Sequence, residues 1–142
     1  MDFVSQILFT ATPLDTTGSW LMLALRVIFG LMMMTNGIIK IAGYRNLVGS
    51  FPDPIHIGSR TSLLLAIFAE ALCSLAVLTG LLFRLALLPQ IVTMCVAYFV
   101  VLGKAPFAQR QLPLSYLLVM LLMLVAGPGR FSLDYLILCG VN

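Results

Sequence analysis

The sequence predicts an all-α membrane protein, a transmembrane four-helix bundle with short interfacial segments at its ends. Apolar residues make up 61% of the 142 positions and charged residues only 9%, whereas soluble domains carry about 25% charge. The mean hydropathy is +1.11. Because a span needs about 20 residues, residues 1–142 are expected to form one domain of four spans embedded in the lipid bilayer.

The first span is expected over residues 20–41, with Trp20 at the membrane interface. Residues 1–18 precede it with apolar side chains at helical spacing, which is typical of a short helix lying on the membrane. Residues 43–60 form the longest and most polar loop. Two prolines flank Asp53 in this loop and favour a rigid, non-helical connection.

The second span is expected over residues 61–82 and the third over residues 85–103. A tight turn joins them, so the two helices should be antiparallel neighbours. Pro89 is expected in the first turn of the third span, where its missing N–H is harmless. Ala76 and Gly80 form a small-x-x-x-small pair that would let a neighbouring helix approach closely.

The fourth span is expected over residues 111–126, because Gly127-Pro128-Gly129 ends it abruptly. Residues 131–141 follow with apolar side chains on one side and are expected to form a terminal interfacial helix. Arg130 and Asp134 stand four residues apart, which is the spacing of an intrahelical ion pair.

Polar residues within the spans are expected to line the interior of the bundle, one stripe on each helix. On the first span, three of them fall within an arc of roughly 80° at about 100° per residue. The predicted intramembrane polar site consists of Arg26, Asn36, Lys40, Glu70, Arg84 and Gln111.

Glu70 is the most informative of these residues, because a carboxylate near the middle of a span needs a partner. From the helical rise, Arg26 lies roughly 9 Å and Glu70 roughly 18 Å from the same membrane face. We therefore predict that Arg26 pairs with Glu70 and that Asn36 hydrogen-bonds from the other side. Lys40 is expected to snorkel to the far interface. The pair could fix helix register, bind a ligand, quinone or proton, or contact an assembly partner.

Several other functions have no support in the sequence. The Lys and Arg residues form no basic run, so no nucleic-acid partner is expected. Cys73, Cys95 and Cys139 form no Cys-x-x-Cys pair of the kind that dithiol oxidoreductases use. His56 is the only histidine and has no ligand-spaced neighbours, so no metal site is expected.

Four segments resemble the DoxX family. The octet from Gly127 to Asp134 looks like its C-terminal signature, and Leu78–Ala86 looks like its turn between the second and third spans. Arg26 with Asn36-Gly37-Ile38-Ile39-Lys40 is similar to its first span, and Ala69-Glu70 to its second. The chain departs from the pattern at Asn36, where many members have His, and at Gln111, near where many have Glu.

This resemblance implies a multi-pass protein of the bacterial inner membrane. Members of the wider group are associated with membrane redox complexes, including a thiosulfate:quinone oxidoreductase subunit. It therefore implies a membrane subunit of a quinone-linked system, with a quinone as ligand and a soluble or membrane oxidoreductase subunit as partner, and it is compatible with an oligomer. The alternatives are a carrier or channel for a small solute and a structural assembly partner without its own chemistry.

Charged residues in the loops and at the span ends favour one orientation. Two cations, Arg84 and Arg130, lie on one side of the predicted bundle. By the positive-inside rule, both termini are expected outside, because five cations lie on the opposite side: Lys40, Arg45, Arg60, Lys104 and Arg110.

Overall fold

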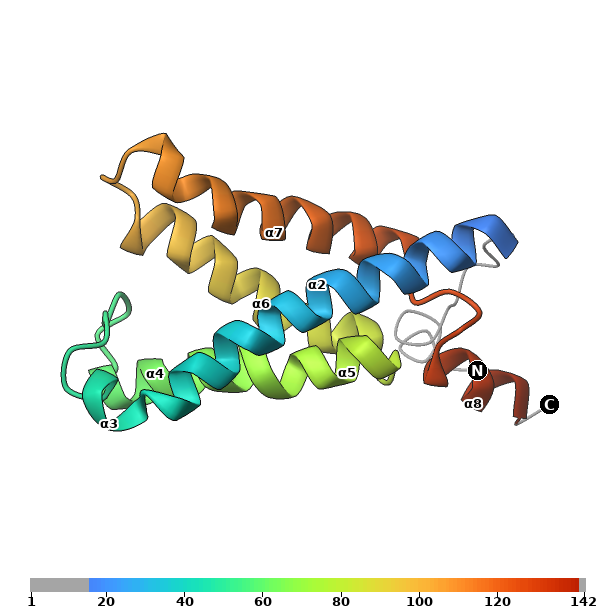
Figure 1. The fold of residues 1–142 in the computed structure, drawn as a ribbon, viewed down its shortest axis with the longest axis horizontal. Helices are drawn as coiled ribbons and strands as arrows, with labels where there is room; N and C mark the ends of the chain where they lie inside the picture. Colours follow the sequence, from blue (N-terminus) through green and yellow to red (C-terminus); the bar gives the residue numbers. More distant parts are fainter. Residues whose placement is uncertain (1–15, 141–142) are drawn as a thin grey trace.

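Four long helices build the protein, and the predicted all-α membrane fold is confirmed (Figure 1). The computed structural model describes residues 16–140, and it contains no strand in that range. The interfacial helix predicted at residues 1–18 lies almost wholly outside the described part. All four helices are long and apolar enough to cross a membrane.

The helices extend beyond or stop short of the predicted spans at several points. They comprise α2 (Thr16–Ala42); α4 (Ser59–Ile67), η1 (Phe68–Leu72) and α5 (Cys73–Thr79) in continuous succession; α6 (Phe83–Val96) followed by η2 (Ala97–Val101); and α7 (Phe107–Ala126). Two short helices, α3 (Tyr44–Leu47) and α8 (Leu133–Gly140), follow the first and fourth spans.

Neighbouring helices run antiparallel. The first helix, α2, packs along η1 and α5, while α6 packs against α5 on one side and α7 on the other. Figure 1 shows that the connection between η2 and α7 lies well apart from α3 and the start of α4, although both are at the same end of the molecule. The two hairpins are therefore splayed at that end.

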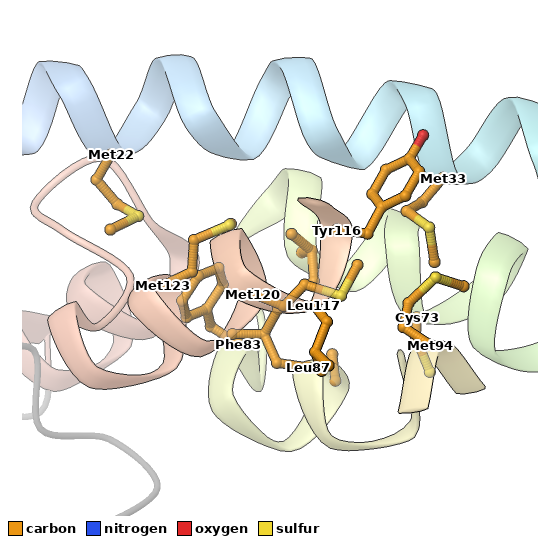
Figure 2. Packing of buried hydrophobic residues seen from close by; sticks show 12 residues of the cluster. Met22, Met33, Cys73, Phe83, Leu87, Met94, Tyr116, Leu117, Met120 and Met123 are labelled. Atoms are coloured by element: carbon orange, nitrogen blue, oxygen red, sulfur yellow. The ribbon is translucent and has the colours of Figure 1, made fainter. Parts of the chain in front are cut away.

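The interior is rich in methionine (Figure 2). Met33, Met120 and Met123 are at most 1% exposed, and they pack with Phe83 and Leu87 in one cluster. Flexible thioether side chains fill irregular gaps between helices well. Large apolar side chains also cover the outside, which is the arrangement expected where hydrocarbon replaces water as the solvent.

The turn between the second and third spans lies earlier in the chain than predicted, at residues 80–82 rather than 83–84. The second span ends at Thr79, because Gly80 and Leu82 both adopt left-handed backbone conformations with φ of 73° and 46°. The third span then begins at Phe83. The prediction that Pro89 lies in the first turn is wrong, since this earlier start places it in the helix interior.

Two π-helical turns interrupt the second and third spans, at η1 and η2. The apolar periodicity of the sequence gave no sign of either. A π turn inserts one extra residue and is frequent at functional sites. In η1, the Cys73 N–H reaches back five residues to the Phe68 carbonyl, and Glu70 lies within this turn.

Two spans approach each other closely at Gly37 of α2. A Cβ atom there would lie 2.7 Å from the Ala71 nitrogen and 2.9 Å from the Glu70 carbonyl carbon. The small pair predicted at Ala76 and Gly80 does not serve this purpose, because Gly80 lies in the turn and faces Ser132. The contact at Gly37 therefore determines the position of η1 along the axis of α2.

Replacement of Gly37 by Ala is expected to force α2 away from η1, because the atoms that it would meet are backbone. Overpacking of this kind costs about 1–3 kcal/mol. The midpoint of thermal unfolding in nanodiscs should fall. Gly49→Ala is the matched control, since a Cβ there meets nothing within 4 Å. Equal unfolding midpoints for the two variants would contradict the close contact.

Candidate functional site

Arg26 lies buried in α2 and donates four hydrogen bonds to backbone carbonyls. Its Nε and Nη2 reach the Val77 and Leu78 oxygens at 3.0 and 2.8 Å. Its Nη1 reaches the Phe131 and Pro128 oxygens at 3.0 and 3.3 Å. The first two are carbonyls of the last turn of α5, where that of Val77 also accepts a hydrogen bond from the Gly80 N–H at 3.2 Å. Arg26 therefore joins α2, α5 and the segment after α7.

The Asp134 carboxylate lies on the other side of the turn between α5 and α6. Its carboxylate accepts hydrogen bonds from the N–H groups of Leu82 and Phe83, at 2.7 and 2.9 Å, where α6 begins. An anion is favourable at a helix N-terminus, as a cation is at a C-terminus. The predicted ion pair between Arg130 and Asp134 is wrong, because the start of α6 engages the carboxylate and Arg130 is exposed before α8.

Gly80 completes this arrangement. Its φ of 73° favours glycine, and a Cβ atom would lie 2.5 Å from the Ser132 Cβ and 2.8 Å from the Arg26 Nη2. The Asp134 N–H donates to the Gly80 carbonyl at 3.1 Å. We call this cluster of Arg26, Gly80, Ser132 and Asp134 the C-terminal clamp. Arg26 and Asp134 each bind backbone groups at the ends of neighbouring helices, which indicates a structural role.

A second buried charge lies toward the splayed end of the bundle. Glu70, in η1, is 3% exposed, and its Oε2 accepts a hydrogen bond from the Lys40 ammonium in the last turn of α2. This is the one ion pair within the part of the chain that the structure describes. Glu70 thus has a cationic partner, but the predicted pairing with Arg26 is wrong. The prediction that Lys40 extends to the far membrane interface is also wrong, because it pairs with Glu70.

The close contact at Gly37 explains why Lys40 is the partner. Since Gly37 touches the backbone of Glu70, the carboxylate stands at the level of this part of α2. Lys40 lies three residues further along, on the same side of the helix. Arg26 lies eleven residues away, or about 16 Å along the axis. The prediction aligned the helices by their expected ends and missed this contact.

Polar side chains behind the ion pair fix its surroundings. The Ser74 hydroxyl donates to the Glu70 carbonyl oxygen at 2.6 Å and accepts from the Gln90 amide at 2.9 Å, so that α6 supports the π turn. Figure 2 shows the Tyr116 hydroxyl of α7 pointing toward α2. The Asn36 side chain of α2 interacts with this hydroxyl. The predicted Arg26–Glu70 pair, which Asn36 was expected to support, does not form.

A cavity of about 300 Å³ lies beside the ion pair, and Lys40 and Glu70 are its two charged lining residues. Ser62 and Thr93 contribute hydroxyl groups. The remaining walls are apolar and come from three parts of the chain: Phe51 and Ile55 of the first loop, Leu65 and Ala66 of α4, and Val92, Val96, Ala97 and Val101 of the third span. Both π-helical segments contribute to this lining.

Asp53 holds the loop that covers one side of the cavity. Its carboxylate accepts hydrogen bonds from the Ile57 and Gly58 N–H groups and from the Ser62 hydroxyl, at 2.8–3.0 Å. Loss of solvent would by itself raise the pKa of this carboxyl. The three hydrogen bonds and nearby His56 outweigh that effect and hold the pKa of Asp53 below its ordinary value.

Replacement of Asp53 by Asn is expected to loosen this loop, because an amide cannot accept all three hydrogen bonds. The stabilisation by Asp53 is complete above the unfolded carboxyl pKa of about 3.9, and it is lost as the pH falls through the lower folded pKa. Trypsin cleavage at Arg60 measures the effect at neutral pH and should become faster. Ser50→Ala, in the same loop, should leave the rate unchanged. Equal rates for Asp53→Asn and the unmodified protein would contradict this role.

The structure separates the other residues of the predicted polar site. Arg84 is half-buried at the start of α6, near the C-terminal clamp, and Gln111 is exposed on α7. The predicted site thus divides into Arg26 at one end and Asn36, Lys40 and Glu70 toward the other. The described residues hold no group of three or more His, Cys, Asp or Glu side chains that could bind a metal ion.

Sequence reasoning did not assign several residues of this region to the site. Thr93 and Gln90 were recognisable as polar residues within a span, but their roles depend on α6 packing against η1. Ser74 and Tyr116 gave no signal, because each is an ordinary residue in a helix. The apolar lining residues could not be recognised without the fold.

The DoxX family model matches residues 21–103. This range includes Arg26, Lys40, Glu70 and the Gly80 turn, and it ends before the C-terminal octet. No curated protein and no solved structure matches the chain. The family match covers more than half of the sequence and agrees with the four membrane-spanning helices. This multi-pass membrane protein therefore belongs to the DoxX family.

Proposed function

We propose that the protein is the membrane subunit of a quinone-linked oxidoreductase system in a bacterial inner membrane, and that the cavity beside Lys40 and Glu70 binds the quinone head group. The observation that carries this proposal is a largely apolar cavity with one ion pair in its wall. Ligand sites of this kind combine apolar walls with a few placed polar groups.

The hydrogen-bonding groups of the cavity favour a ligand that accepts hydrogen bonds. The Ser62 hydroxyl already donates to Asp53, and the Thr93 hydroxyl donates to the Pro89 carbonyl at 2.8 Å. Each hydroxyl has one proton to donate. Lys40 has three N–H donors, of which Glu70 takes one. Lys40 is therefore the side chain that supports recognition of a quinone carbonyl oxygen.

The volume and walls also suit this ligand. About 300 Å³ is at the lower end of small-molecule sites, which agrees with a single ring system whose tail remains among the lipids. A bound quinone would supply the exchange of electrons and protons. The protein would orient the ring through Lys40, while the Glu70 carboxylate would hold a proton beside the carbonyl oxygen. A partner subunit would deliver or accept the electrons.

Binding of a short-tailed photoreactive quinone to the purified protein in nanodiscs tests the proposal. Labelling is expected on peptides of α4, η1 or η2, with competition by unlabelled quinone. Ala97→Leu should fill the cavity and abolish labelling without a change of charge. Val100→Leu is the matched control, because Val100 is an exposed residue of the same π turn outside the cavity lining. Labelling that survives Ala97→Leu, or falls on other segments, would overturn the proposal.

A further inference from the structure

Three exposed cations surround the splayed end of the bundle. Arg45 lies on α3, Arg60 is the second residue of α4, and Lys104 lies between η2 and α7. No ion pair reaches any of them within residues 16–140. We call these three side chains the basic rim. They lie at the same end of the bundle as Lys40 and the loop that lines the cavity.

Acidic groups at this end do not neutralise the basic rim. Asp53 is engaged by the loop N–H groups and Ser62, and Glu70 is paired with Lys40. A fourth cation, Arg110, lies over the Tyr98 ring at 4.2 Å and donates to the Tyr98 carbonyl. The splayed end therefore presents positive charge outward.

The opposite end has a different balance. Arg26 is buried in the C-terminal clamp, together with the anion of Asp134. Arg130 is exposed there, and Arg84 is half-buried. When the buried charges are left out, the splayed end still carries more exposed positive charge than the opposite end.

We propose that the splayed end faces the cytoplasm, that the basic rim binds anionic phospholipid head groups there, and that the cavity consequently opens toward the cytoplasmic leaflet. Short cytoplasmic loops carry the excess of Lys and Arg in membrane proteins. The cytoplasmic leaflet is also the one with negative surface potential. This placement holds whichever ligand the cavity takes.

The neighbours of the rim favour lipid over an acidic soluble protein. Ile41, Phe99 and Phe107 lie close to it in the sequence and are 52%, 64% and 61% exposed. Such side chains belong in hydrocarbon, which places the adjacent cations at the depth of the head groups. In this orientation, a proton that exchanges with the carboxylate in the cavity wall comes from the cytoplasmic side.

Labelling with a membrane-impermeant maleimide tests the orientation. Gly49→Cys places a thiol in the exposed first loop, and Thr17→Cys places one at the exposed start of α2. The unmodified protein gives the background from the native cysteines. Gly49→Cys is expected to react only in inverted vesicles and Thr17→Cys only in intact cells. The reverse pattern, or labelling of each site from both sides, would overturn the proposal.

Lipid retention tests the basic rim directly. The protein is purified from vesicles that mix phosphatidylglycerol with phosphatidylethanolamine, and retained lipids are quantified. Enrichment of phosphatidylglycerol is expected, and it should be lost when Arg45, Arg60 and Lys104 are all replaced by Gln. Arg130→Gln, at the other end, should retain it. If the triple variant keeps its lipid enrichment but no longer binds an acidic soluble protein, the rim serves a protein partner and the lipid proposal is wrong.

Discussion

Arg26→Met should produce one of the two largest losses of stability among single substitutions in the bundle. Methionine is similar in length and apolar, so the variant removes the guanidinium and leaves most of the packing. The carbonyls of Leu78 and Phe131 then lose the guanidinium donor, and that of Val77 keeps only the Gly80 N–H. Asp134 also loses the nearest buried cation. Removal of one member of a buried charged group costs roughly 3–5 kcal/mol.

Two comparisons separate this effect from a general loss of charge. Arg26→Lys retains the charge, but an ammonium cannot reach carbonyls on both sides as a planar guanidinium does, so an intermediate loss is expected. Arg130→Met removes an exposed cation from the same end and should change little. Thermal unfolding in nanodiscs gives the order of stability of the three variants. Size-exclusion chromatography detects the unfolding. An unfolding midpoint for Arg26→Met equal to that of Arg130→Met would contradict the C-terminal clamp.

The contrast between the spans and the clamp shows what the sequence can predict. Hydropathy identifies the four spans, because every residue of a span contributes to the same average. The role of Arg26 depends instead on carbonyl groups 51 and 105 residues away at Val77 and Phe131. Every residue carries a carbonyl group, so sequence offers no sign of which ones lack a partner. A search for opposite charge consequently selected Glu70.

The cavity illustrates a second limit. The sequence predicted a carboxylate within the second span that needs a cation, and this much is correct. The choice between Arg26 and Lys40 depended on where η1 lies along α2, which is determined by the contact of Gly37 with Glu70 and Ala71. The extra residue of a π turn rotates the direction of the side chains that follow it by about 100°. Local sequence patterns do not contain that information.

Lys40 and Glu70 should be coupled strongly in stability and also needed together for ligand binding. Lys40→Met leaves the carboxylate of Glu70 buried, at 3% exposure, without its cation. A loss of roughly 3–5 kcal/mol is expected. Glu70→Leu should cost less, because the Lys40 side chain is 24% exposed and can turn toward water.

The double variant Lys40→Met with Glu70→Leu distinguishes a structural ion pair from a ligand site. A buried pair replaced by apolar residues of similar volume often leaves stability unchanged or higher. The double variant should therefore regain most of the unfolding midpoint that Lys40→Met loses. If the pair recognises a quinone, this stable variant still fails to bind the photoreactive probe, because the donor and the acceptor are both gone. Arg60→Met, a cation outside the cavity lining, should bind normally. A double variant that recovers stability and binding together would show that Lys40 and Glu70 only hold the helices in register.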